Sequence, residues 1–167
     1  MNFRVLGVPQ EIADEVRLTR RSPGYGHLAQ AEVAGGTGPC RCCLRPFVPG
    51  EERRLLFTYR PPGRESTLNA PGPVFIHEHP CTAWEGEGFP DALRELPLAY
   101  EARASGSRVI ALSIGGNVPA ESRIDELLGR PEVQWLHLRH AEAGCFIAIV
   151  EKQRAPRLPA EPLAVSS

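Results

Sequence analysis

The sequence predicts an α+β fold: a mainly antiparallel sheet with two or three short helices on one side. Two pairs of strand-like segments are joined by short loops that contain glycine, as in β-hairpins. These hairpin loops outnumber the helical patterns that would connect parallel strands, which disfavours a doubly wound fold. The chain has 167 residues, of which 42% are hydrophobic, and this is enough to bury one core of ordinary size.

The chain begins with a strand that is followed by a helix. Residues 2–8 alternate between apolar and polar side chains, which is typical of a strand. Pro9 then opens a helix, because its fixed φ angle suits the first helical turn. Ile12, Ala13 and Val16 share one face of that helix.

A long loop leads to two further strands. Glycine and proline residues interrupt residues 18–39, where one short strand is expected at 28–33. Residues 53–60 and 73–79 are predicted to be strands, because apolar side chains alternate along them. The side chains on their apolar faces are Leu55, Phe57, Tyr59, Val74 and Ile76.

The second half of the chain alternates between turns, strands and a helix. Pro90 starts a short connecting helix. Residues 98–103 and 108–113 flank a glycine-containing loop and are predicted to form a hairpin. Residues 121–128 have apolar side chains at helical spacing, and Gly129 ends that helix.

A second hairpin is predicted from residues 133–140 and 145–151. In the first of these strands, Leu136 and Leu138 are expected to face the core. The opposite face of the strand carries Trp135, His137 and Arg139. The pairing register depends on the connecting loop, because a bulge there would exchange the faces of the second strand.

Residues 1–152 are predicted to form a single domain. Residues 153–167 are predicted to be a disordered tail, because prolines interrupt any regular element and little apolar surface is available for packing. The prolines of this tail are Pro156, Pro159 and Pro162.

Charge and hydropathy exclude several classes of partner. With 19 basic and 20 acidic residues, the formal net charge of −1 gives no general attraction to nucleic acid or to an anionic membrane. No segment approaches the roughly 20 apolar residues of a membrane span, and no secretion signal is recognised. We therefore expect a cytoplasmic protein whose binding depends on a local site.

Four metal-ligating residues occur as two close pairs, Cys40-x-x-Cys43 and His77-x-x-x-Cys81. Three thiolates and an imidazole can supply the four ligands of a tetrahedral zinc ion. The interval of 34 positions between Cys43 and His77 is longer than in the usual zinc finger or ribbon. The alternative is that the cysteines are free buried thiols and that His77 is a core residue.

Several arginines suggest that a small anionic molecule binds near the cysteines. Arg41 lies between them, Tyr59 and Arg60 end a predicted strand, and Arg139 shares a strand face with His137. Guanidinium groups bind carboxylates and phosphates through paired hydrogen bonds. The alternative is that these arginines are surface charges that balance nearby acids.

Several motifs occur in order along the chain: Cys40-Arg41-Cys42-Cys43-Leu44, Leu56-Phe57-Thr58-Tyr59-Arg60-Pro61, Gly72-Pro73-Val74-Phe75-Ile76-His77 with Cys81, His137-Leu138-Arg139, and Gly144-Cys145-Phe146. From about Cys40 to Val150, the sequence resembles a bacterial family known only as domain of unknown function 1203. The resemblance implies that these positions are shared: Cys40, Arg41, Cys43, Tyr59, Arg60, His77, Cys81, His137, Arg139 and Cys145. It also implies that Cys42 and His79 are additional in this chain, which favours the two ligand pairs described above.

Three functions are compatible with these residues. In the first, zinc stabilises a domain that binds a small anion. In the second, the protein is an enzyme in which Cys145 is the thiolate nucleophile, His137 or His77 is its base, and the arginines orient an anionic substrate. In the third, Cys40 and Cys43 cycle between dithiol and disulfide. This third function ranks last, because the cysteines do not lie at the start of a helix that follows a strand.

Overall fold

The computed structural model describes residues 2–61 and 70–153 of the chain. Residues 154–167, which make up nearly all of the predicted tail, lie outside the described residues. In chain order the elements are β1 (Phe3–Leu6), α1 (Gln10–Thr19), β2 (Gln30–Val33), β3 (Arg53–Tyr59), β4 (Gly72–His77), the 3-10 helix η1 (Asp91–Leu93), β5 (Leu98–Arg103), the 3-10 helix η2 (Ser105–Ser107), β6 (Val109–Ile114), α2 (Ala120–Leu128), β7 (Trp135–His140) and β8 (Phe146–Lys152).

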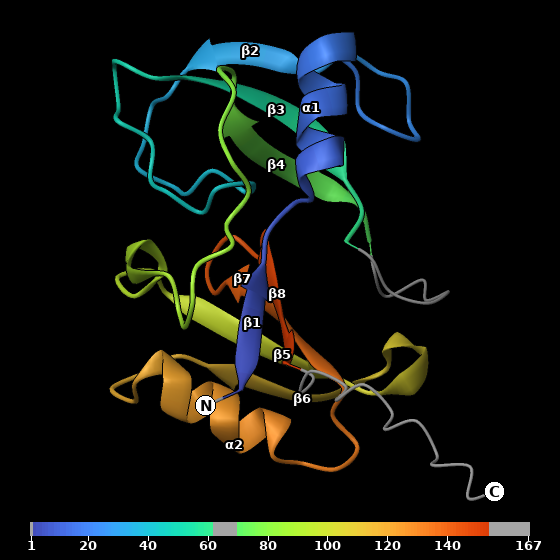
Figure 1. Ribbon diagram of the computed structural model, residues 1–167, viewed down its shortest axis with the longest axis vertical. Helices are drawn as coiled ribbons and strands as arrows, with labels where there is room; N and C mark the ends of the chain where they lie inside the picture. Colours follow the sequence, from blue (N-terminus) through green and yellow to red (C-terminus); the bar gives the residue numbers. More distant parts are fainter. Residues whose placement is uncertain (1, 62–69, 154–167) are drawn as a thin grey trace, which may run out of the picture.

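The strands divide between two antiparallel sheets. One sheet has five strands in the order β1-β8-β7-β5-β6, and the other has three in the order β2-β3-β4. The chain leaves the five-stranded sheet after β1, builds the three-stranded sheet, and returns at β5 (Figure 1). The α+β class and the antiparallel pairing are confirmed, but two sheets form where the sequence suggested one.

Each sheet has its own helix. Val16 of α1 belongs to the same apolar cluster as Phe57 of the three-stranded sheet. Ile124 of α2 belongs to the cluster of Leu136 in the five-stranded sheet. The prediction that the helices lie on one side of one sheet is therefore corrected, because two sheets present two apolar faces that need cover. Among the described residues, neither helix is long and apolar enough to cross a membrane.

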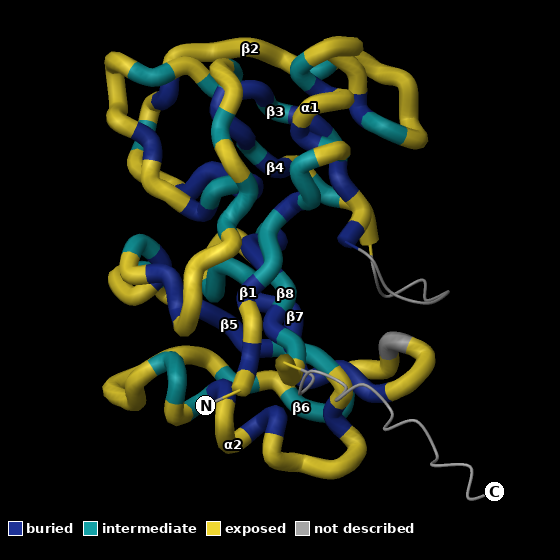
Figure 2. Tube along the Cα trace, in the orientation of Figure 1, coloured by how far each residue is buried: buried dark blue, intermediate teal, exposed yellow. Residues whose placement is uncertain are grey.

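The buried residues gather into two apolar clusters, one at each sheet (Figure 2). Cys40 and Cys42 belong to the cluster of the three-stranded sheet, whereas Leu44 belongs to that of the five-stranded sheet. The ring of Tyr59 in β3 lies 5.7 Å from the ring of Phe146 in β8, measured between centroids. Residues 40–44 thus contribute side chains to both apolar clusters.

Both predicted hairpins form, with β5 paired to β6 and β7 paired to β8. Leu136 and Leu138 are buried in the core, as the alternation predicted. The opposite face of β7 is covered as well, because His137 is 0% exposed. A bulge shifts the register after Leu138, so that Arg139 lies opposite Phe146.

Candidate metal centre

Residues 40–44 form a tight turn that presents two thiols. The N–H of Leu44 donates to the carbonyl of Cys40 at 2.9 Å, and the N–H of Cys40 donates to the carbonyl of Arg45 at 2.9 Å. Leu44 has a φ angle of 57°, which is uncommon for a residue with a side chain. Burial of its side chain in the core stabilises this conformation, and the turn brings Cys40 and Cys43 together.

Strand β4 ends beside this turn and supplies the histidine. The backbone N–H of Arg41 donates to the carbonyl of Phe75 at 2.8 Å, which ties the turn to β4. The backbone N–H of His77 contacts the sulfur of Cys40 at 3.4 Å. These two contacts fix the position of His77, the last residue of β4.

Two side chains of helix α1 contact the fourth candidate ligand, Cys81, which follows β4 in the chain. The side chain of Gln10 donates from Nε2 to the carbonyl of Cys81 at 3.1 Å and accepts the N–H of Ala83 at 2.7 Å. About two turns further along the same face of the helix, Nη2 of Arg17 donates to the sulfur of Cys81 at 2.9 Å. Gln10 and Arg17 are seven residues apart and therefore lie on the same side of the helix.

Four side chains converge on one point: Cys40, Cys43, His77 and Cys81, whose ligand atoms all lie within 4.8 Å of one another. The sulfurs of Cys40 and Cys81 are 3.8 Å apart, and the sulfur of Cys43 is 3.5 Å from Nδ1 of His77. A tetrahedral zinc ion with the usual bond lengths would separate two sulfurs by about 3.8 Å, and a sulfur and a nitrogen by about 3.6 Å. Both distances match the edges of such a tetrahedron.

An acidic residue orients the histidine from behind. Nε2 of His77 lies 3.2 Å from Oε2 of Glu52, while Nδ1 faces the thiols. Nη2 of Arg45 is 3.1 Å from the same Nε2, but it also donates to Glu52 at 2.9 Å. Two N–H donors cannot bond each other, so Glu52 is the acceptor for both groups.

Electrostatics favours the charged form of this acid. The Arg45 guanidinium and the backbone N–H of Val48 together lower the pKa of Glu52 to about 2. Burial acts to lower the pKa of His77, but contacts with the thiols and with Glu52 outweigh it and raise that pKa to about 10. The carboxylate is therefore ionised at neutral pH and accepts a hydrogen bond from the ring.

The crowded thiols shift one another's pKa values in opposite directions. Hydrogen bonds from three neighbouring thiols lower the pKa of Cys81. Contact with Cys81 and burial raise the pKa of Cys42, and contact with Cys40 raises that of Cys43. Negative charge is therefore best stabilised on the sulfur of Cys81, to which Arg17 also donates.

A family model described as "Protein of unknown function (DUF1203)" matches residues 37–152, more than half of the chain. The chain belongs to this family. No curated protein and no solved structure matches it. The segment shared with the DUF1203 family contains all four residues of the candidate metal centre and ends with β8, whereas β1, α1 and β2 precede it.

In this DUF1203 protein, Arg41 is buried and its donors are directed at the protein itself. Its Nε donates to the carbonyl of Phe146 at 2.6 Å and its Nη1 to the carbonyl of Pro39 at 2.6 Å. Its Nη2 donates to the sulfur of Cys145 at 3.3 Å. Burial lowers the pKa of Arg41, although the nearby thiols partly oppose this effect. Arg41 thus links the cysteine turn to the five-stranded sheet.

Arg139 forms an ion pair within the five-stranded sheet of the DUF1203 fold. Its Nε lies 2.8 Å from Oε1 of Glu101 on the neighbouring strand β5, and its Nη1 donates to the carbonyl of Gly144 at 3.3 Å. His137, two residues earlier, is fully buried with its ring centroid 5.8 Å from that of Phe146. The pair with Glu101 was not predicted from the sequence, because the two residues meet only through the pairing of β5 with β7.

Three of the residues predicted to form a site line a common cavity in this DUF1203 chain. Tyr59, Arg139 and Cys145 border a cavity of about 230 Å³. Burial raises the pKa of Tyr59 to about 12. Arg60, the next residue after β3, is exposed and does not border this cavity.

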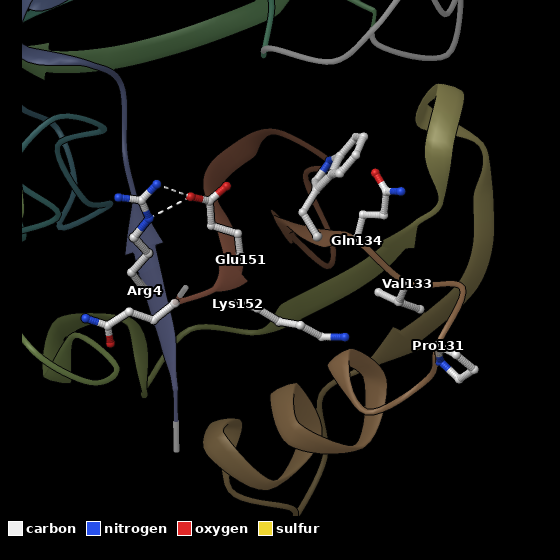
Figure 3. A pocket seen from close by; sticks show the side chains of 8 residues that line it. Arg4, Pro131, Val133, Gln134, Glu151 and Lys152 are labelled. Atoms are coloured by element: carbon white, nitrogen blue, oxygen red, sulfur yellow. Dashed lines mark hydrogen bonds and ion pairs between the residues drawn. The ribbon is translucent and has the colours of Figure 1, made fainter. Parts of the chain in front are cut away.

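A larger cavity lies away from the cysteines. It has a volume of about 910 Å³ and is bordered by the ends of β1, β7 and β8 (Figure 3). The ion pair between Arg4 and Glu151 forms one side of it, and Gln134 and Val133 lie across from that pair. Its lining residues include no cysteine or histidine, so this cavity is separate from the Cys/His cluster.

Three residues of the metal centre were not predicted from the sequence: Glu52, Arg45 and Arg17. Arg45 follows the cysteine motif directly, which is the only local signal among them. Glu52 and Arg17 reach the centre through the packing of the loop before β3 and of α1. A carboxylate or guanidinium near a metal ligand has no spacing rule that would reveal it in one sequence.

Proposed function

We propose that this protein is a zinc-stabilised domain in which Cys40, Cys43, His77 and Cys81 bind one Zn²⁺. The observation that supports the proposal most directly is the convergence of these four ligand atoms within 4.8 Å. Two of their separations, 3.8 Å between sulfurs and 3.5 Å between sulfur and nitrogen, suit a tetrahedral ion. Three thiolates and one imidazole are soft and borderline donors, which favour zinc over magnesium or calcium.

The role of the metal in this proposal is structural. Four protein ligands complete a tetrahedral shell and leave no open position for a substrate or an activated water. The ligands come from the turn at residues 40–43 and from the end of β4 with the segment that follows it. Zinc would therefore fasten the cysteine turn to the end of β4 and to the segment that follows it.

The charge of the centre is also consistent with zinc. Three thiolates around one Zn²⁺ give a net charge of −1, which in a partly buried site needs a compensating cation. Arg17 supplies that cation at Cys81, with its side chain only 9% exposed. The Glu52 carboxylate fixes the His77 ring, as acids commonly do for metal-bound histidines.

Elemental analysis tests this proposal. Protein purified without a metal-affinity tag should contain about one zinc per chain, and a chelator should remove the metal and lower the melting temperature. Cys43→Ser should lose most of the zinc, whereas Cys145→Ser should retain it, because Cys145 lies outside the cluster. A parent protein with less than about a tenth of an equivalent of zinc would contradict the proposal.

The cavity beside Cys145 favours a second candidate function, in which the protein binds a small anion or acts on it as an enzyme. Cys145 and Arg139 border the same cavity, and the sulfur of Cys145 accepts a hydrogen bond from Arg41. A thiol beside a guanidinium in a cavity is a candidate nucleophile. Melting curves in phosphate, sulfate and small carboxylates test it: an anion should raise the melting temperature of the parent and have little effect on Arg139→Lys. Equal responses of the two proteins would remove Arg139 from this function.

A further inference from the structure

Strand β6 is an outer strand, and one of its two edges has no partner strand among the described residues. The five-stranded sheet has the order β1-β8-β7-β5-β6, so β6 pairs only with β5 (Figure 1). This pairing is regular from Ala111 to Ile114, because its register shift falls between Ala102 and Arg103, near the start of β6. The second edge of this regular stretch is therefore able to receive a further strand.

The backbone groups on this edge belong to Leu112 and Ile114. Gly115, the residue after β6, donates its N–H to the carbonyl of Leu98 in β5 at 2.7 Å. In an antiparallel pair, successive residues direct their backbone groups alternately toward the partner strand and away from it. Since Gly115 faces β5, Ile114 and Leu112 direct their N–H and carbonyl groups away from the sheet.

The same two residues carry exposed apolar side chains. Leu112 is 62% exposed and Ile114 is 63% exposed. They are two residues apart, so both side chains stand on the same side of the sheet. Ala111, on the opposite side, packs against the apolar cluster beneath α2. The edge of β6 therefore combines unpaired backbone groups with aliphatic side chains.

The other outer strands carry features that hinder pairing with a further strand. Strand β1 contains Arg4, β2 contains Glu32 and β4 contains Pro73. Charged side chains and proline on outer strands are the usual protection against edge-to-edge pairing of sheets. Residues 109–120 contain no charged residue, and their single proline lies beyond the strand. Of the outer strands that the structure describes, β6 is the one that lacks such protection.

We propose that β6 is a dimer interface and that it pairs antiparallel with β6 of a second copy of this chain across a twofold axis. Charge selects this partner. Two β6 strands bring no charged side chain together, whereas pairing of β6 with β1 or β2 of another copy would desolvate Arg4 or Glu32. A twofold contact also closes at two chains, while pairing of β6 with a different edge would continue without end.

The backbone and the side chains together define the register of this contact. When Leu112 lies opposite Ile114 of the second copy, the outward backbone groups of both strands face each other. The exposed side chains then form two apolar cross-strand pairs, with Ser113 on the twofold axis. Pairing Leu112 with Leu112 would instead place Ile114 opposite Ile110, which lies at the register shift of β6. The inference does not depend on the metal centre, because β6 contains none of its four candidate ligands.

Sedimentation velocity of the full chain over a wide series of concentrations tests the interface. We expect a reversible equilibrium between monomer and dimer. Leu112→Lys and Ile114→Lys should each raise the dissociation constant about tenfold or more, because the contact would bury a charge. Two positions are used so that one misfolded variant, detected by circular dichroism, still leaves a test. Leu28→Lys is the matched control, because Leu28 is 64% exposed and lies outside β6; it should dimerise as the parent does.

Hydrogen–deuterium exchange identifies the edge that is used. The amides of Leu112 and Ile114 should exchange more slowly in the parent dimer than in the dilute monomer, because they are then hydrogen-bonded between copies. A parent that stays monomeric at every concentration would overturn the inference and leave the edge to an extended segment of a different protein. A dimer that survives both lysine substitutions, or assemblies that grow beyond two chains, would overturn it as well.

Discussion

Oε2 of Glu52 lies 3.2 Å from Nε2 of His77, on the side of the ring opposite to the thiols. The acid and the histidine come from different segments, the loop before β3 and the end of β4. Antiparallel pairing of β3 with β4 brings these segments together, because Arg54 pairs with His77. The sheet therefore sets the orientation of the imidazole.

Replacing this acid should weaken metal binding without unfolding the protein. Glu52→Gln keeps the shape of the side chain but removes the charge that orients and polarises His77. We expect zinc affinity to fall by about 10- to 100-fold, measured by competition with a chromophoric chelator. Glu51→Gln is the control, because Glu51 is exposed and its neutralisation changes the net charge equally. Equal affinities for the two variants would show that Glu52 does not support His77.

Removing the Arg41 side chain should destabilise the protein as a whole. Arg41→Ala leaves the carbonyls of Phe146 and Pro39 without the donors they now have at 2.6 Å. Buried acceptors without partners are costly, and we expect a loss of about 2 to 4 kcal/mol in the free energy of unfolding. Arg4→Ala, at an exposed ion pair, should cost under about 1 kcal/mol. Urea denaturation of both variants would reveal whether the difference exists.

A methyl group at Gly7 should separate β1 from the cysteine turn. A Cβ atom there would overlap the carbonyl oxygen of Arg41, which accepts the N–H of Val8 at 2.6 Å. Because both partners are backbone, neither can move freely, and Gly7→Ala should cost about 1 to 3 kcal/mol. Gly35→Ala has open space around the added methyl and serves as the control. Matching melting temperatures for the two variants would argue against this close approach.

The ion pairs of Glu78 should contribute stability that depends on pH. Arg20, at the end of α1, and Arg53, in β3, both contact this carboxylate, and Arg20 has the larger share in lowering its pKa. A lowered pKa in the folded state gives stability above the unfolded-state pKa, which is lost as the pH falls through the folded value. Glu78→Gln should therefore be less stable than the parent by about 0.5 to 1 kcal/mol at pH 7.

The difference between Glu78→Gln and the parent should shrink in acid, where the parent carboxylate is protonated as well. High salt at pH 7 should also reduce it, because both arginines are about half exposed. Thermal unfolding at several pH values and salt concentrations measures this. A difference that is constant across pH would assign the effect to packing.

The convergence of the four candidate ligands was predictable because it rests on residue chemistry at short spacing. Each pair of candidate ligands is close in sequence, so a local bend of the chain is enough to bring Cys40 to Cys43 and His77 to Cys81. The support from Arg17 was not predictable, because it depends on where α1 docks on the three-stranded sheet. The roles suggested for Arg41 rested on residue type alone, and burial directed its donors to backbone carbonyls.

The fold was predictable where neighbours in sequence pair with each other. Helix α2 and the β7–β8 hairpin are confirmed because apolar spacing and turn residues define them locally. The division into two sheets was not predictable, since it depends on the pairing of β1 with β8 across the whole described chain. The bulge after Leu138 was not predictable either, because it depends on how β7 pairs with β8.

The pairing of β1 with β8 has a consequence for the order of assembly. Phe3 pairs with Lys152, so β1 is synthesised well before β8 and acquires this neighbour in the sheet only when β8 has left the ribosome. The four candidate ligands from Cys40 to Cys81 are synthesised much earlier, so in the zinc-binding form proposed above they would be available while the five-stranded sheet is still missing its last strand. Closing that sheet requires contact between distant parts of the chain, which is the slow kind of step in folding. During synthesis, the metal-bound half would then serve as the folded platform on which the five-stranded half is completed.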